Sequence, residues 1–114
     1  MIILEKIQTG HPKKLLTNLK RRVTQLANGN SWIRIGITGN PKKRWTKYMS
    51  SGPCWDRMEL LYKTSSYTHI VEMEAQLISH LYHNDKLWNF TGGGGGSIWP
   101  EQGYYLYCLV RRDR

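Results

Sequence analysis

The stretch from Trp32 to Tyr48, WIRIGITGNPKKRWTKY, constrains the fold of this chain more than any other. Isoleucines stand at every second position in its first half, and this period of two predicts a strand with one buried face. Gly39 then permits a tight turn. Asn40 suits the N-cap of a helix, and Pro41 suits the first helical position because an amide there would be unpaired anyway. The stretch therefore predicts a strand, a turn and the start of a helix, in that order.

The helix expected after Pro41 is basic, with Trp45 and Tyr48 among its cations. These cations are Lys42, Lys43, Arg44 and Lys47. The charge of the whole chain is also uneven, because residues 1–50 hold eleven Lys or Arg and one acid whereas residues 51–114 hold six and seven. Such an asymmetry indicates a face that meets a polyanion, most simply nucleic acid. A general bias toward solubility is the alternative.

The length of 114 residues predicts a single domain over 1–114. Cys54 and Cys108 are too few and too far apart to indicate a zinc site or a disulfide framework. With no secretory signal at the start, an intracellular protein, cytoplasmic or nuclear and not secreted, is expected. No apolar run approaches the length of a membrane span, so no membrane partner is expected.

The remaining segments predict the other elements of a small α/β (α+β) fold. Residues 1–10 read as a short extended piece, and residues 13–27 have the apolar period of an amphipathic helix. A strand is expected over 55–63, a helix from 67 to about 83, and a tyrosine-rich strand over 103–110. The fold expected is a three-stranded, mainly antiparallel sheet flanked by helices. The polar face of the first helix either grips a DNA backbone or is an ordinary solvated face; it carries Lys13, Lys14, Lys20, Arg21 and Arg22.

Glu74 is a carboxylate with apolar neighbours one turn before and after it in the expected helix. Because such a group loses hydration, it needs a cation, a donor or a metal ion, and a structural pair with an Arg or Lys is the alternative to a functional role. His80 and His83 have a spacing that suits two metal ligands, but no neighbouring ligand completes a site, so solvated histidines are expected. The glycine run 92–96 lacks the Gly-Lys-Ser/Thr that would support a nucleotide-binding loop.

Three pieces of the chain, taken in order, resemble the GIY-YIG nuclease superfamily. They are the stretch IRIGITGNPKKRWTKY, the helix VEMEAQLI and the asparagine beyond it, covering roughly residues 31–91. The resemblance implies that Gly36 is the glycine of the second signature and that Arg44, eight residues on, is the catalytic arginine. It also matches Tyr48 to the family's Tyr-or-His position and Glu74 to its metal-binding glutamate. Asn89 resembles the asparagine that often follows.

The chain departs from the family pattern at two points. Arg34 stands where the second signature has its tyrosine, and the first signature is missing ahead of the stretch. Gly103-Tyr104-Tyr105 near the C-terminus has the pattern of that first signature. We therefore expect strand 103–110 to pair with strand 32–37 in a circularly rearranged fold, with Tyr105, or Tyr107 on the same strand face, bringing a hydroxyl to the site. The alternative is that this strand only builds the sheet.

The resemblance implies a metal-dependent endonuclease that hydrolyses phosphodiester bonds of DNA, with RNA as a second possible substrate and Mg²⁺ or Mn²⁺ bound by Glu74. A domain of this size is also expected to need a homodimer or a specificity partner. The rivals are a non-catalytic nucleic-acid-binding module on the same scaffold and, less favoured, a basic protein-interaction domain. The catalytic residues implied are Arg44, Glu74, Tyr48 and Tyr105. The residues expected to contact substrate are Arg34, Lys42, Lys43, Lys47 and Asn89.

Overall fold

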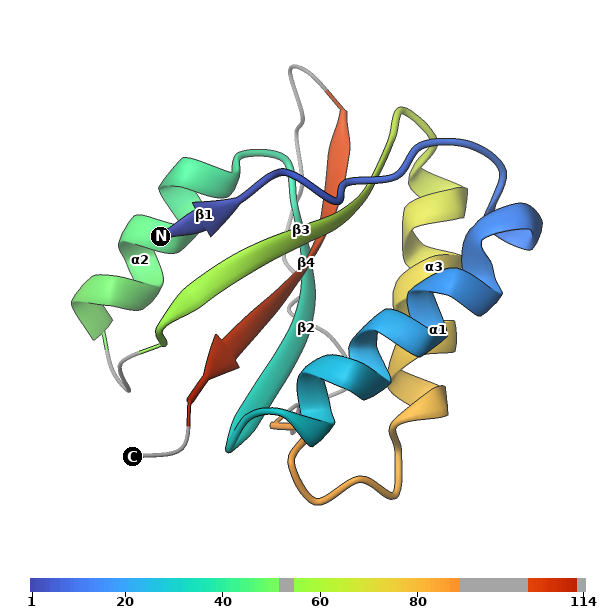
Figure 1. The fold of residues 1–114 in the computed structure, drawn as a ribbon. Coiled ribbons are helices and arrows are strands. Elements are labelled where there is room, and N and C mark those ends of the chain that lie inside the picture. Colours follow the sequence, from blue (N-terminus) through green and yellow to red (C-terminus); the bar gives the residue numbers. More distant parts are fainter. Residues whose placement is uncertain (52–54, 89–102, 113–114) are drawn as a thin grey trace.

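The computed structural model describes residues 1–51, 55–88 and 103–112. Helices and strands alternate along these residues (Figure 1). In chain order they are β1 (Ile2–Ile3), α1 (Pro12–Asn28), β2 (Trp32–Thr38), α2 (Pro41–Ser51), β3 (Arg57–Thr64), α3 (Tyr67–His80) and β4 (Tyr104–Arg111).

The last strand of the chain is a central strand of the sheet. The strand order is β1-β3-β4-β2, and β4 runs antiparallel to both of its neighbours. Its register with β2 extends from the pair Trp32 and Arg111 to the pair Thr38 and Tyr105. The predicted pairing of the C-terminal strand with strand 32–37 is therefore confirmed.

The described residues form an α+β fold with a four-stranded mixed sheet and three helices, and the expectation of three strands was wrong. The extra strand is β1, which pairs in parallel with β3 through Ile2 opposite Met58 and Ile3 opposite Glu59. A strand of two residues is too short to show an alternating pattern in sequence, so its partner has to be known first. The third helix also ends at His80, earlier than expected, because the amide of Leu81 closes the helix as its C-cap.

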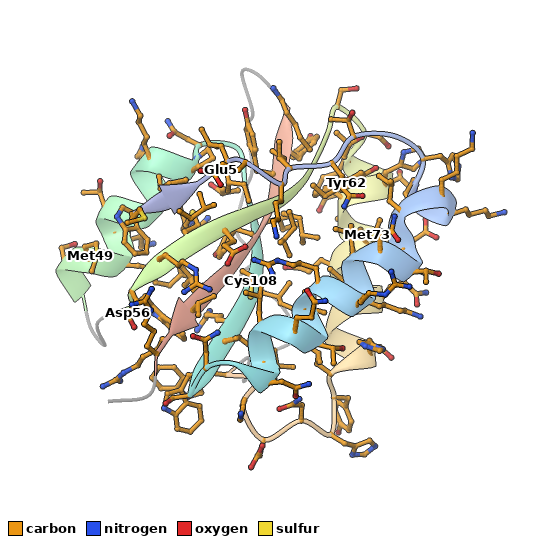
Figure 2. All side chains as sticks on the ribbon, in the orientation of Figure 1. Glu5, Met49, Asp56, Tyr62, Met73 and Cys108 are labelled. Carbon is orange, nitrogen blue, oxygen red and sulfur yellow. The ribbon has the colours of Figure 1, made fainter. Side chains whose placement is uncertain are left out.

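The sheet separates two apolar layers. α1 and α3 cover one face, and α2 lies on the other (Figure 1). Met73 of α3 and Cys108 of β4 belong to the larger layer, between the sheet and the helix pair (Figure 2). The smaller layer, under α2, is rich in aromatic side chains; its buried members are Trp55, Met58, Leu60, Tyr107 and Leu109.

Side chains in the preceding turns cap the three helices. The His11 ring accepts a hydrogen bond from the Lys13 amide at 3.2 Å at the start of α1. The Asn40 carboxamide oxygen accepts one from the Lys43 amide at 3.1 Å, which confirms the capping role predicted for Asn40. Ser66 does the same for α3, where the His69 amide is the donor.

A buried carboxylate ties α1 to the sheet. Glu59 of β3 is only 3% exposed, and it forms ion pairs with Arg22 of α1 and, at 2.9 Å, with Arg57 of its own strand. Burial alone would raise the pKa of the Glu59 carboxyl, but the hydrogen bonds and charges of the two guanidinium groups together lower it below its ordinary value of 4.5. The ionised form is therefore favoured in the folded protein.

Replacing Glu59 by Gln should lower the free energy of unfolding at neutral pH by about 2 kcal/mol, because two partly exposed cations lose their shared anion. Since the pKa of Glu59 is lowered by folding, its stabilising contribution is present above pH 4.5 and is lost as the pH falls through the folded-state pKa. Urea unfolding followed by circular dichroism measures both effects. Glu72→Gln, an exposed change in α3, is the matched control. Equal acid sensitivity of wild type and Glu59→Gln would contradict this role.

Candidate active site

A tyrosine lies directly across Gly36 on the face of the sheet that α2 covers. Tyr107 of β4 is the register partner of Gly36 in β2, and its side chain is fully buried. A Cβ atom built on Gly36 would overlap the phenol ring, at 2.5 Å from Cζ of Tyr107. Only glycine therefore leaves room for the hydroxyl end of Tyr107 at this point of the strand.

Tyr48 of α2 holds this arrangement together. Its hydroxyl forms a hydrogen bond of 2.8 Å with the hydroxyl of Tyr107, and the two rings meet edge to face with centroids 6.1 Å apart. Arg34, two residues before Gly36 on the same face of β2, places its guanidinium carbon 5.8 Å from the centroid of the Tyr48 ring. One side chain of α2 thus contacts both a buried hydroxyl and a cation of the sheet.

The charge balance of the site keeps the buried hydroxyl protonated. Burial raises the pKa of Tyr107 far above its ordinary value of 10.0, and the neighbouring Tyr48 hydroxyl raises it further. The positive charges of Arg44 and Arg34 act in the opposite direction without overcoming burial. The neutral phenol of Tyr107 is therefore favoured in the folded protein.

Arg44 lies in α2 one helical turn before Tyr48, on the same side of the helix. It is half-buried, and its positive charge acts to lower the pKa of Tyr107. Arg34 is half-buried as well, and its buried Nε has no hydrogen-bond partner among the described residues. Arg34 thus packs on the Tyr48 ring, and Arg44 lies on the same side of α2 as Tyr48.

The other cations of α2 surround this cluster at the surface. Lys42, Lys43 and Lys47 are exposed, and the first turn of α2 contains no acid. The amide of Asn40 bonds the Thr38 hydroxyl at 3.1 Å, which fixes the turn from β2 into the helix. The N-terminal half of α2 is therefore a positively charged edge next to Arg44.

Tyr105 does not share the position of Tyr107. It is the register partner of Thr38, and the ammonium group of Lys63 lies 5.2 Å from its ring centroid. Both tyrosines are on the face of β4 that α2 covers, as alternation predicts, but the hydrogen bond to Tyr48 is made by Tyr107. Of the two candidates that the sequence left open, the structure brings Tyr107 to the cluster.

Glu74 projects from a helix on the other side of the sheet. It is 9% exposed and lies on the buried side of α3 with Ile70, Met73 and Leu77. Because α2 and α3 lie on opposite faces (Figure 1), Glu74 and Arg44 approach the sheet from opposite directions. Asn89, the remaining candidate, lies outside the described residues.

The described residues contain no group of three or more His, Cys, Asp or Glu side chains placed to hold a metal ion. The Nε2 atom of His80 lies 2.9 Å from the Thr24 hydroxyl of α1, and the ring of His83 packs edge to face on Tyr82. The donor that fits Mg²⁺ or Mn²⁺ is the buried Glu74 carboxylate, a hard oxygen ligand. Oxygens from a phosphate and from water would have to complete its coordination.

The basic face of α1 lies away from α2. α1 shares the far face of the sheet with α3 (Figure 1), and its Arg22 is engaged by Glu59. Lys6, Arg21 and Arg22 line a hollow of about 210 Å³ there. The cations predicted as one DNA-binding surface thus divide between the two faces of the sheet.

No helix among the described residues has the length and apolar character needed to cross a membrane. Comparisons with protein-family models, with curated proteins and with solved structures gave no significant match.

The sequence signal for Tyr107 was present but incomplete. Alternation places Tyr105 and Tyr107 on one face, whereas the choice between them depends on the register with Gly36. Trp32 was not singled out, although the same alternation places it on the face of Arg34 and Gly36.

Replacing Gly36 by Ala should lower the free energy of unfolding by about 1–3 kcal/mol, because the new methyl group overlaps the Tyr107 ring. The effect should be much smaller in a Tyr107→Val background, where the ring is gone. A double-mutant cycle measured by urea unfolding gives this coupling. Additive losses would show that the two residues do not constrain each other.

Proposed function

We propose that this protein is a metal-dependent endonuclease that hydrolyses phosphodiester bonds of DNA. The observation that carries the proposal is the cluster over Gly36, in which the hydroxyls of Tyr48 and Tyr107 are hydrogen-bonded, Arg34 packs on the Tyr48 ring and Arg44 stands one helical turn before Tyr48. A hydroxyl pair together with two guanidinium groups suits a phosphate whose charge increases during cleavage. The resemblance of the surrounding sequence to GIY-YIG nucleases supports the same reaction.

The two arginines have separate tasks in this proposal. Arg44, at the charged edge of α2, binds the scissile phosphate through its planar guanidinium and offsets the charge that develops there. Arg34 contributes a second cation beside the Tyr48 ring, and its guanidinium can donate to a phosphate oxygen. The exposed lysines 42, 43 and 47 attract the neighbouring phosphates.

The tyrosine pair handles the proton. Because the two hydroxyls share one hydrogen bond, Tyr107 can donate to the Tyr48 oxygen while Tyr48 exchanges a proton with the water or the leaving oxygen. A divalent ion bound by Glu74 would supply stabilisation of negative charge on the phosphate and leaving group.

The position of Glu74 favours a second candidate, a nucleic-acid-binding module without catalysis. Glu74 approaches from the face opposite Arg44, and a scaffold that only binds phosphate needs no contribution from it. The arginines and lysines on the α2 side would serve such a module equally well. Both candidates are expected to bind nucleic acid, but only the nuclease is expected to cleave it. A cleavage assay therefore separates them.

Wild-type protein should nick supercoiled plasmid DNA in the presence of Mg²⁺. Arg44→Ala should reduce the cleavage rate by roughly 10²–10³-fold, which is the usual effect of removing one group that stabilises charge in the transition state. Arg44→Lys should recover only part of this rate, because it keeps the charge but loses the bidentate geometry. Gel assays of plasmid nicking measure the rates.

Glu74→Gln should abolish nicking while DNA affinity in EDTA stays at the wild-type level. Glu72→Gln, an exposed carboxylate two residues away in the same helix, is the matched control and should cleave normally. If wild type cleaves no duplex, branched or single-stranded substrate, yet binds DNA through Arg44, the binding module is the correct description.

Tyr48→Phe and Tyr107→Phe should each slow cleavage, by at least tenfold and by up to about 10²-fold for a proton-transfer role. The double variant should be about as slow as either single variant, because the two hydroxyls form one hydrogen-bonded pair. Single-turnover cleavage rates measure this, with Tyr67→Phe as a control for a tyrosine at the surface of α3. Losses that multiply would indicate that the hydroxyls act independently.

A further inference from the structure

An exposed tryptophan lies beside the cluster on the same strand face. Trp32 is two residues before Arg34 in β2, so about 6.6 Å separates the two positions along the strand. Although it belongs to a sheet strand, Trp32 remains 40% exposed, while the buried face of the strand is fully covered. A large aromatic surface is thus presented to solvent next to the proposed phosphate site.

Two further tryptophans support this ring from beneath. Trp88 contacts Trp32 with centroids 5.8 Å apart, and Trp55 contacts Trp88 at 5.6 Å. Trp55 is 4% exposed and belongs to the core under α2, so the series extends from the interior to the surface. This packing limits the rotamers of Trp32 and lowers the entropy lost when a ligand covers it.

The charges beside Trp32 are positive. Arg111 is its register partner in β4 and therefore projects from the same face of the sheet, and Arg34 follows along β2. One acid, Asp56, lies beside Arg111, because its neighbour Arg57 is the register partner of Val110. The Asp56 carboxylate accepts a hydrogen bond from the Arg112 amide at 2.6 Å. An exposed aromatic ring on a strand face that also carries two arginines suits a ligand that has both a flat apolar surface and a negative charge.

We propose that Trp32 is a stacking platform for an unpaired nucleobase, whose own or adjacent phosphate lies at Arg34. This inference rests on the proposed function and names its substrate class: nucleic acid with an exposed base, as in a single strand, a strand end or a flipped nucleotide. A base inside a continuous duplex has both faces covered by its neighbours and cannot stack on a protein ring.

Binding of short fluorescein-labelled oligonucleotides in EDTA tests the platform without cleavage. The three probes are a single strand, the same backbone with abasic sites at its centre, and a blunt duplex. Wild type should prefer the single strand to the other two. Trp32→Ala should weaken single-strand binding by roughly tenfold, the usual contribution of one stacked base, and should leave binding of the abasic strand almost unchanged. Trp32→Phe should retain much of the affinity.

Tyr67→Ala is the matched control, because Tyr67 is an exposed aromatic residue that packs on Tyr104 at the opposite end of β4. Thermal unfolding checks that the variants are folded. Wild-type affinity of Trp32→Ala for the single strand, or an equal loss on the abasic strand, would overturn the platform. Nicking with Mg²⁺ is scored separately. If only the nuclease proposal is wrong, cleavage is absent, but wild type and Trp32→Ala still differ in single-strand binding. If only the platform is wrong, wild type cleaves, but the two proteins bind the single strand equally well.

Discussion

The close packing of Tyr107 on Gly36 is the contact on which the site depends. It requires the last strand of the chain to lie between β2 and β3, and it requires a residue without a side chain at the point where the ring crosses β2. The Tyr107 hydroxyl then meets Tyr48, and Tyr48 in turn contacts Arg34. Residues more than fifty positions apart are joined in this way, so the cluster cannot form before the C-terminal strand has entered the sheet.

The sequence predicted those parts of the fold that depend on neighbouring residues. The alternation in β2, the Asn40 cap and the pairing of β4 with β2 could all be inferred from local patterns or from the resemblance. The sequence could not provide the positions of residues that are distant along the chain. The register between β2 and β4 decides which tyrosine faces Gly36. The packing of α3 decides from which side of the sheet Glu74 approaches. β1 gains its strand character only from contact with β3.

The two faces of the sheet have different physical characters. Aliphatic side chains and the buried Glu59 ion pairs join α1 and α3 to one face, and this layer stabilises the fold. Aromatic rings dominate the face under α2, where they carry polar groups into partly buried positions beside cations. The buried carboxylates Glu59 and Glu74 lie on the side of α1 and α3, whereas the α2 face carries the tyrosine pair and Arg34.

Arg34 fits this division better than a tyrosine would. The cluster already contains two hydroxyls, and Tyr107 is held protonated by burial, so a third hydroxyl would add little to proton transfer. A guanidinium at this position adds a charge for phosphate and links two neighbours, since it packs on the ring of Tyr48 and stands two residues from Trp32. At the position where the resembled signature has a tyrosine, this chain thus places a cation beside a pair of hydroxyls. A substrate that offers a phosphate and an exposed base would use both the cations and the tryptophan beside them.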